Sequence, residues 1–340
     1  MSDSMIVLGI DCSTQSLSAA VLEIPRDVSG GAAPRTLFEQ SVVFTQDPRT
    51  NAFGVDPDTL ILPPQFPGQA DQPPGMFLAA LDAVLSDLQS AGAPLDRIAA
   101  IQISAQQHGH VYLSASAKEA FQSVASGACG KSLVEVFTDS YSYPSCPIWL
   151  TSSTKNEADD LRQRIGGKAA MIETSGSDSP LRFSGAVIRK VGLEFPKQYE
   201  ETRAIRLLSA FLSGVLCGKM DVPADWGNAS GTSLMDYRAR DWSPQLIEAA
   251  AADLPGGSQA LREKLGEVAH PLSWAGPIAQ YFHERFGIPI DCKVGIGSGD
   301  NPQSKVGTSG DLLSLGTSFV FMIEQDTPSV DPQGFSNSMY

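Results

Sequence analysis

The stretch that decides the fold of this 340-residue chain is Met5-Ile-Val-Leu-Gly-Ile-Asp-Cys-Ser-Thr-Gln-Ser-Leu-Ser-Ala-Ala-Val-Leu22. An apolar segment, a turn of small polar residues and a second apolar segment predict two strands joined as a hairpin. The turn, residues 11–16, supplies one carboxylate, several hydroxyls and a run of backbone N–H groups. Such a turn can cradle a phosphate and hold a metal ion beside it, or it can be the plain turn of an ordinary hairpin. Partners for a phosphate site elsewhere in the chain would decide between the two.

Composition sets the class of protein and excludes several functions. Apolar residues make up 42% of the chain and charged residues 18%, which suits a folded protein of two domains with a large core. The net charge of −14 argues against binding nucleic acid or an anionic membrane through bulk electrostatics. No apolar run approaches the length of a bilayer span, and the acidic start of the chain does not resemble a secretory signal. We therefore expect neither a nucleic-acid partner nor a membrane partner.

Cysteine and histidine usage favours a cytoplasmic protein without a zinc site. The dispersed, odd-numbered cysteines form no Cys-x-x-Cys pair, which is typical of reduced thiols rather than of a disulfide framework. The four histidines have no companion ligands at zinc spacing. The cysteines are Cys12, Cys129, Cys146, Cys217 and Cys292.

The first part of the chain is predicted to contain three strands, a helix and a further strand. After the hairpin we expect a strand over residues 36–44, a long loop over 46–74, a helix over 76–90 and a buried strand over 98–104. Three strands before the first crossover helix favour a ribonuclease-H-like α/β fold over a Rossmann strand order. The chain also lacks the GxGxxG and GxxxxGK[ST] fingerprints of the common nucleotide-binding loops.

The later segments predict mostly helices and then a second strand–turn–strand unit. Thr154 and Glu157 resemble a capping box that opens a helix. Residues 312–323 repeat the opening theme around the small-residue turn Gly316-Thr-Ser318, which predicts two similar domains facing one cleft. The other expected elements are a short strand over 111–113, a strand over 147–150, helices over 154–165, 186–194, 205–216, 243–252, 258–265 and 278–286, and turns over 224–232.

Seven motifs spread over nearly the whole chain resemble those of the FGGY carbohydrate kinases, within the actin/hexokinase/Hsp70-type ATPase superfamily. Each motif is short, and their common order makes the resemblance specific; it is greatest to the animal-type xylulokinase branch of the family. The resemblance implies two similar domains around a cleft, a sugar-kinase domain over residues 1–288 and the beginning of a second domain over 289–340. The motifs are Asp11-Cys-Ser-Thr-Gln-Ser16, Ser104-Ala-Gln-Gln-His-Gly109, Cys146-Pro-Ile-Trp-Leu-Thr-Ser-Ser-Thr154, Arg182-Phe-Ser-Gly185, Asp225-Trp-Gly-Asn-Ala-Ser-Gly231, Gly299-Asp-Asn301 and Leu313-Ser-Leu-Gly-Thr-Ser318.

The activity that the resemblance implies is ATP-dependent phosphorylation of a ketopentose, with D-xylulose and D-xylulose 5-phosphate as the first choice of substrate and product. A sugar hydroxyl is a weak nucleophile, so a carboxylate should accept its proton during phosphoryl transfer. By similarity, Asp300 is this general base. Gly295, Gly297 and Gly299 would allow close backbone approach around it, and Asn301 could bind the sugar hydroxyls. Taken alone, Gly-Asp-Asn would equally suit a plain turn.

The resemblance also assigns residues to the sugar, to ATP and to Mg²⁺. Asp11 would orient Mg²⁺ through water, since this ion gives up its hydration shell reluctantly. His108 and Arg182 each have an ordinary alternative, as a structural histidine and as a surface arginine beside a helix. The residues assigned to the sugar are Gln107, His108, Arg182, Asp300 and Asn301. Those assigned to ATP are Asp11, Ser13, Thr14 and Gln15 in the first phosphate turn and Gly316, Thr317 and Ser318 in the second.

Two departures from the family pattern leave alternatives open. Thr151 stands where the family usually carries an acidic residue, which bears on the identity of the sugar. The chain reaches Tyr340 shortly after the second phosphate turn, so the glycine-rich adenosine pocket of the family is not expected within it and the second domain is expected to be incomplete. The alternatives are a ribulokinase, a gluconokinase, a glycerol kinase or a non-catalytic sugar-binding relative. A homodimer is compatible with all of them.

Overall fold

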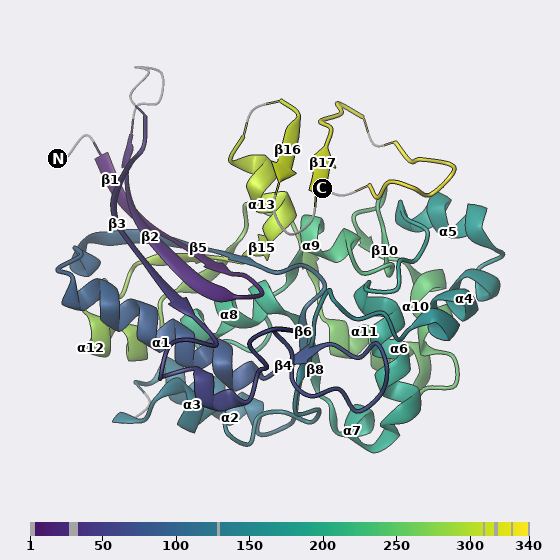
Figure 1. Cartoon of the computed structure of the whole chain (residues 1–340), viewed down its shortest axis with the longest axis horizontal. Coiled ribbons are helices and arrows are strands. Elements are labelled where there is room, and N and C mark those ends of the chain that lie inside the picture. Colours follow the sequence, from purple (N-terminus) through teal and green to yellow (C-terminus); the bar gives the residue numbers. More distant parts are fainter. Residues whose placement is uncertain are drawn as a thin grey trace.

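The computed structural model describes residues 4–26, 33–127, 130–308, 310–315, 319–327 and 329–338. Its organising element is a seven-stranded mixed sheet with the order β13-β14-β5-β1-β2-β3, in which β15 pairs with β5 further along that strand (Figure 1). The strands of this sheet are β1 (Ser4–Cys12), β2 (Ser16–Pro25), β3 (Arg35–Val43), β5 (Ile98–Ala105), β13 (Trp274–Pro277), β14 (Lys293–Gly295) and β15 (Ser298–Gly299).

The strand directions confirm the ribonuclease-H-like layout. β1, β2 and β3 are antiparallel neighbours, whereas β5 lies parallel to β1 and β14 lies parallel to β5. In this register Asp11 lies opposite Ser18 on β2 and Ser104 on β5. The predicted opening hairpin is therefore present, and its turn lies at the same edge of the sheet as the end of β5.

Side-chain alternation explains how the opening strand meets the core. Leu8, Ile10 and Cys12 are buried on one face of β1, while the residues between them are half-buried on the other. Burial of each large apolar side chain contributes about 1.5–3 kcal/mol. On the buried face, α1 (Pro74–Ser90) packs on β2 and β3, and α8 (Leu208–Cys217) packs on β5 (Figure 1). The same core includes residues of α2 (Ala117–Ala125), α3 (Leu133–Val136) and α12 (Gln280–Phe286).

A second core lies beyond the sheet and is mainly helical. Figure 1 shows these helices grouped on the side away from β1–β3. Its helices are α4 (Lys155–Arg164), α6 (Ser184–Glu194), α7 (Pro196–Glu201), α9 (Trp226–Ser230), α10 (Pro244–Ala251) and α11 (Gly257–Leu265). A further helix, α5 (Lys168–Ser175), contacts α4. Other short strands pair outside the large sheet: β4 (Asp71–Gln72) with β7 (Cys146–Pro147), β6 (His110–Leu113) with β8 (Ala204–Leu207), β9 (Ala224–Asp225) with β12 (Val268–Ala269), and β10 (Met235–Asp236) with β11 (Asp241–Trp242).

Three of the expected elements need correction. Residues 205–216 were expected to form one helix, but the first of them belong to β8, which pairs with β6 before α8 begins. The expected strand over 147–150 is reduced to Cys146–Pro147. The turns expected over 224–232 contain the short helix α9. In each case, pairing with a distant segment or a local cap decides the structure, and the apolar pattern of the segment carries no sign of it.

The predicted capping box at the start of α4 is also wrong. Thr154 occupies the N-cap position, but no side-chain hydrogen bond caps the helix there. Instead, its hydroxyl donates to the carbonyl of Leu181. The threonine therefore fastens α4 to the segment that precedes Arg182.

The end of the chain carries the second predicted strand pair. β16 (Leu312–Leu315) and β17 (Phe319–Met322) are antiparallel, as expected, and α13 (Asp300–Val306) precedes them. The proposed division at residue 288 stays a prediction; β14 and β15, on its C-terminal side, pair with β5 of the N-terminal sheet. Within the described ranges, no helix has the length and apolar character needed to cross a bilayer.

Candidate active site

The turn between β1 and β2 presents free backbone donors beside a carboxylate. The turn is closed by a hydrogen bond from the Ser13 amide to the Ser16 carbonyl (2.9 Å), and the Ser13 hydroxyl donates to Oδ2 of Asp11. The backbone N–H groups of Thr14 and Gln15 donate to no other residue in the described part of the chain. Unused N–H groups in a tight turn next to a carboxylate are the chemistry expected of a site for phosphate and its metal ion.

A closed ring of hydrogen bonds joins this turn to the side chains of Gln106 and Gln72, and Trp149 adds a further bond. The Thr14 hydroxyl accepts from Nε1 of Trp149 (2.8 Å) and donates to Oε1 of Gln106 (3.3 Å). Nε2 of Gln106 donates to Oε1 of Gln72 (2.8 Å), whose own Nε2 returns to the Thr14 carbonyl (2.8 Å). Because this ring engages the hydroxyl proton of Thr14, the donor that Thr14 can offer to a ligand is its backbone N–H group. Sequence patterns predict these roles for none of the three partners, and Gln72 carries no local signal of them.

Asp300, the predicted base, lies at the start of α13 with one oxygen fixed. Its Oδ1 accepts the backbone N–H groups of Gln107 (3.2 Å) and Asn301 (2.9 Å), and no described residue donates to its Oδ2. Burial raises the pKa of this carboxyl to about 6, and the negative charge of Asp11 adds to the rise. The two carboxylates, which lie far apart in the sequence, are therefore close enough to interact.

The glycines before Asp300 leave room for the side chains of neighbouring residues. A Cβ on Gly299 would lie 2.3 Å from Cγ of Gln107, and one on Gly295 would lie 1.9 Å from Oε1 of Gln102. Gly297 has a left-handed backbone, with φ of +76°. The expectation that these glycines permit close packing is confirmed.

His108 is buried and held as a neutral ring. Its backbone is left-handed, with φ of 68°, which is uncommon for a residue with a side chain. Since the Gly231 carbonyl can only accept, Nδ1 of His108 carries the proton of their 2.7 Å hydrogen bond. Burial lowers the pKa of the ring to about 3, with a smaller contribution from the positive charge of Arg182. The ring stacks on Phe183 at 4.5 Å between centroids, and its Nε2 is left as an acceptor.

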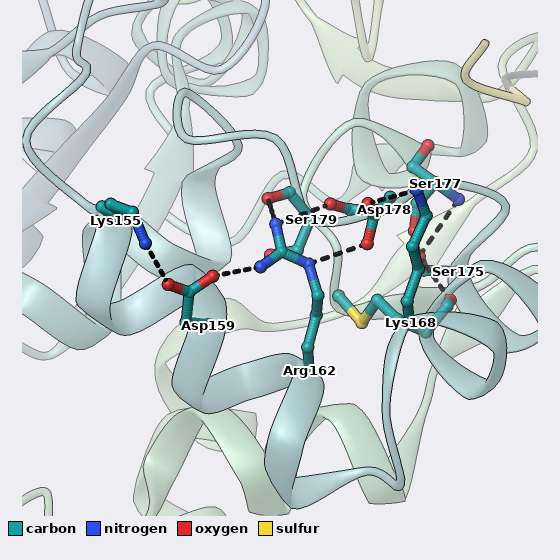
Figure 2. Close-up of polar contacts among 9 residues, drawn as sticks. Lys155, Asp159, Arg162, Lys168, Ser175, Ser177, Asp178 and Ser179 are labelled. Carbon is teal, nitrogen blue, oxygen red and sulfur yellow. Dashed lines mark hydrogen bonds and ion pairs between the residues drawn. The ribbon is translucent and has the colours of Figure 1, made fainter. Parts of the chain in front are cut away.

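Arg182 follows a segment that ion pairs fix in place. Figure 2 shows Asp178 between Arg162 and Lys168, with distances of 2.7 Å to Nε of Arg162 and 3.3 Å to Nζ of Lys168. The bond from Thr154 to Leu181 adds a second anchor directly before the arginine. Among the residues that the structure describes, Arg182 itself forms no hydrogen bond or ion pair, and its charge is felt by His108. Its guanidinium lies 5.9 Å from the centroid of the Phe183 ring, a contact that leaves its N–H groups available to a ligand.

The structure brings most of the predicted site residues together at the ends of β1, β5 and β15. Asn301 donates from Nδ2 to Oε1 of Gln107 (2.8 Å), so these two residues and Asp300 form one cluster. The second phosphate turn, Gly316, Thr317 and Ser318, lies outside the described residues, as does Cys129. The other cysteines, Cys12, Cys146, Cys217 and Cys292, are free and buried, in line with the expectation of reduced thiols.

Comparison with known proteins first defines the class of fold. The crystal structure of xylulose kinase from Rhodospirillum rubrum has a TM-score of 0.72 at 17% identity, and the match covers 96% of this chain and 57% of that one. This likeness confirms the actin- and hexokinase-like fold of the carbohydrate kinases. No protein-family model matches the chain.

Sequence similarity then indicates the branch of the carbohydrate kinases that this chain resembles. Xylulose kinase 2 of Arabidopsis thaliana is 34% identical over 318 residues, which cover 92% of this chain and 53% of the plant protein. Xylulose kinase of Rattus norvegicus is 30% identical over 340 residues, covering 97% of this chain and 58% of the rat protein. The resemblance to xylulokinases is therefore confirmed, and the chain spans a little over half the length of these relatives.

Proposed function

We propose that this chain binds a ketopentose and provides the general base for its phosphorylation by ATP, with D-xylulose as substrate and D-xylulose 5-phosphate as product. The observation that carries the proposal is the carboxyl of Asp300. One of its oxygens is fixed by two backbone N–H groups, the other accepts from no described residue, and its pKa is about 6. At neutral pH such a group is mostly ionised yet retains a high affinity for a proton, which is what a general base requires.

In this proposal Asp300 accepts the proton of the C5 hydroxyl while that oxygen bonds to the γ-phosphorus and the bond to ADP breaks. Asn301 and Gln107, joined to each other, present amide groups beside the base. Nε2 of neutral His108 accepts a hydrogen bond from another sugar hydroxyl, and Arg182 donates to sugar oxygens. The protein's task is to orient the sugar and remove one proton.

The phosphate side of the proposal rests on the turn after β1. Its free N–H groups at Thr14 and Gln15 would face the phosphates of ATP, beside Ser13. No group of three or more His, Cys, Asp or Glu side chains in the described residues could form a complete metal site. Asp11 alone fits Mg²⁺, because this ion binds through one or two carboxylates while keeping water and phosphate ligands. When bound, Mg²⁺ would neutralise charge on the transferring phosphate and relieve the repulsion between Asp11 and Asp300.

Two measurements test the proposal. Calorimetry with D-xylulose, D-ribulose, gluconate and glycerol should show binding of the ketopentoses and strongest binding of D-xylulose. Coupled assay of ADP release should show stimulation by the same sugar and its loss in Asp300→Asn. The matched control is Asp96→Asn, which alters an exposed carboxylate in the segment before β5. Absence of binding for every sugar of the panel would overturn the proposal. Preferred binding of gluconate or glycerol would show that D-xylulose is not the substrate.

A cytoplasmic location belongs to the same proposal and is supported by the four free cysteines. The homodimer stays a prediction, to be tested by light scattering.

A further inference from the structure

A second buried carboxylate lies behind the site and has no part in the mechanism above. Asp225 is 2% exposed and caps the N-terminus of α9. Its Oδ2 accepts the Gly227 amide (3.0 Å) and its Oδ1 accepts the Asn228 amide (3.2 Å). A helix cap alone would need nothing more.

The additional partner of Asp225 is a side chain from the strand that leads to the base. The hydroxyl of Ser298 donates to Oδ2 of Asp225 at 2.6 Å, across 73 residues of sequence. Ser298 and Gly299 form β15, which is held on its other side by pairing with Ser104 and Ala105 at the end of β5. Asp300 follows β15 directly. β15, which directly precedes the base, is thus fixed between β5 and the carboxylate of Asp225.

The same short helix also reaches the sugar side of the site. Residues 225–231 begin with the cap that holds Ser298 and end with the Gly231 carbonyl that accepts Nδ1–H of His108. In between, Nδ2 of Asn228 donates to the Ser209 hydroxyl on α8, which anchors the helix to the sheet layer. Figure 1 shows α9 beside β15, and the two elements are in contact.

We propose that Asp225 is a positioning residue, which acts through Ser298 to hold the carboxyl of Asp300 in its buried orientation. The proposal rests on the proposed function of Asp300 as base. It assigns to Asp225 no contact with sugar or phosphate, since both of its oxygens are taken by Ser298 and the start of α9. Loss of the bond between Asp225 and Ser298 lets β15 shift and admits water to Asp300.

Two variants remove this bond from opposite sides. Ser298→Ala deletes the hydroxyl and keeps the Asp225 carboxyl and its cap of α9, but it also removes a hydrogen bond that lowers the pKa of Asp225. Its effect on Asp300 is therefore compared with that of a second variant, which removes the carboxyl altogether. Asp225→Ser keeps a good cap for α9 but is too short to reach Ser298. The matched control is Asp236→Asn, because Asp236 also accepts two backbone N–H groups, from Arg238 and Ala239, in a turn of the same region.

The decisive measurement is the titration of the Asp300 carboxyl by ¹³C NMR in the chain itself, with the resonance assigned from Asp300→Asn. We expect a midpoint near pH 6 in the unaltered chain and in Asp236→Asn. In Ser298→Ala and Asp225→Ser the midpoint should fall by at least half a unit, because water reaches the carboxylate. A midpoint in Ser298→Ala equal to that of the unaltered chain overturns the proposal.

Kinetics provide a second readout. Ser298→Ala should lower kcat about tenfold while KM for the sugar changes less than threefold, since the ligand contacts remain. Equal losses in Ser298→Ala and Asp236→Asn would contradict a positioning role. If the unaltered chain neither binds nor phosphorylates sugar, the proposed function fails, and the NMR titration still decides whether Asp225 positions Asp300.

Discussion

Asp225 and Asp300 are two aspartates at the starts of short helices, and burial raises the pKa of each to about 6. They differ in what their oxygens bind. Asp225 accepts three hydrogen bonds that occupy both oxygens, whereas the bonds that Asp300 accepts from other described residues all reach Oδ1. A perturbed pKa therefore does not by itself identify a catalytic group; an oxygen left without a donor does so far better.

The largest expected effect separates the two aspartates by chemistry. Asp300→Asn should lower kcat about 10³-fold, because general base catalysis contributes roughly 10²–10⁴-fold. Measurement of ADP release with D-xylulose provides the test, with Asp96→Asn as control. Retention of more than a tenth of the activity in Asp300→Asn would contradict the assignment of Asp300, rather than Asp225, as the catalytic aspartate.

The next effect is on the free energy of unfolding. At neutral pH the substitution that lowers activity should raise stability. The folded pKa of Asp300 lies above the value of about 3.9 in an unfolded chain, so the folded state binds more protons between about pH 4 and 6. Stability is therefore lost as the pH rises through this window, by on the order of 2–3 kcal/mol for a shift of about two units. Asp300→Asn should flatten this slope and be more stable than the unaltered chain at pH 7. Urea unfolding at pH 4, 5, 6 and 7 measures it, and an unchanged slope would contradict the burial of the charge.

A smaller effect is expected at Arg182, the other group left open to a ligand. Arg182→Gln should raise KM for the sugar about tenfold, in line with the roughly 1.5–3 kcal/mol of a hydrogen bond to a charged group. The melting temperature should change little, because this arginine forms no hydrogen bond or ion pair with a described residue and lies 5.9 Å from the centroid of the Phe183 ring. Arg97→Gln, at an exposed position, is the control. A fall in melting temperature without a change in KM would assign Arg182 to the structure instead.

The smallest effect tests the closed ring beneath the phosphate turn. Trp149→Phe removes the donor to the Thr14 hydroxyl and should cost about 1 kcal/mol of unfolding free energy, the usual worth of one hydrogen bond. Its effect on the titration of Asp300 should be negligible. Trp274→Phe, on the edge strand β13 with the indole 55% exposed, should cost almost nothing under the same urea titration. Equal costs for the two variants would mean that the ring does not stabilise the turn.

Much of the fold could be predicted, because the alternation in β1 and the helical spacing in α1 are properties of local sequence. β8 could not be predicted, since its residues continue the apolar pattern of α8 and only pairing with β6 separates them. The candidate site also contains residues that local sequence predicts and residues whose roles depend on distant contacts. Asp300 belongs to a short motif, whereas the role of Asp225 depends on Ser298, which lies far away in sequence and adjacent in space.

The buried charge of Asp300 has a consequence for protein engineering. An amide at position 300 would remove the cost of burying a charge, whereas the hydrogen bond to Gly231 and the stacking on Phe183 stabilise His108 in spite of its left-handed backbone. Selection of variants for heat tolerance alone should therefore accumulate Asp300→Asn and discard the site. A library screened for thermal robustness needs a simultaneous requirement for sugar binding, or its best survivors will be inert.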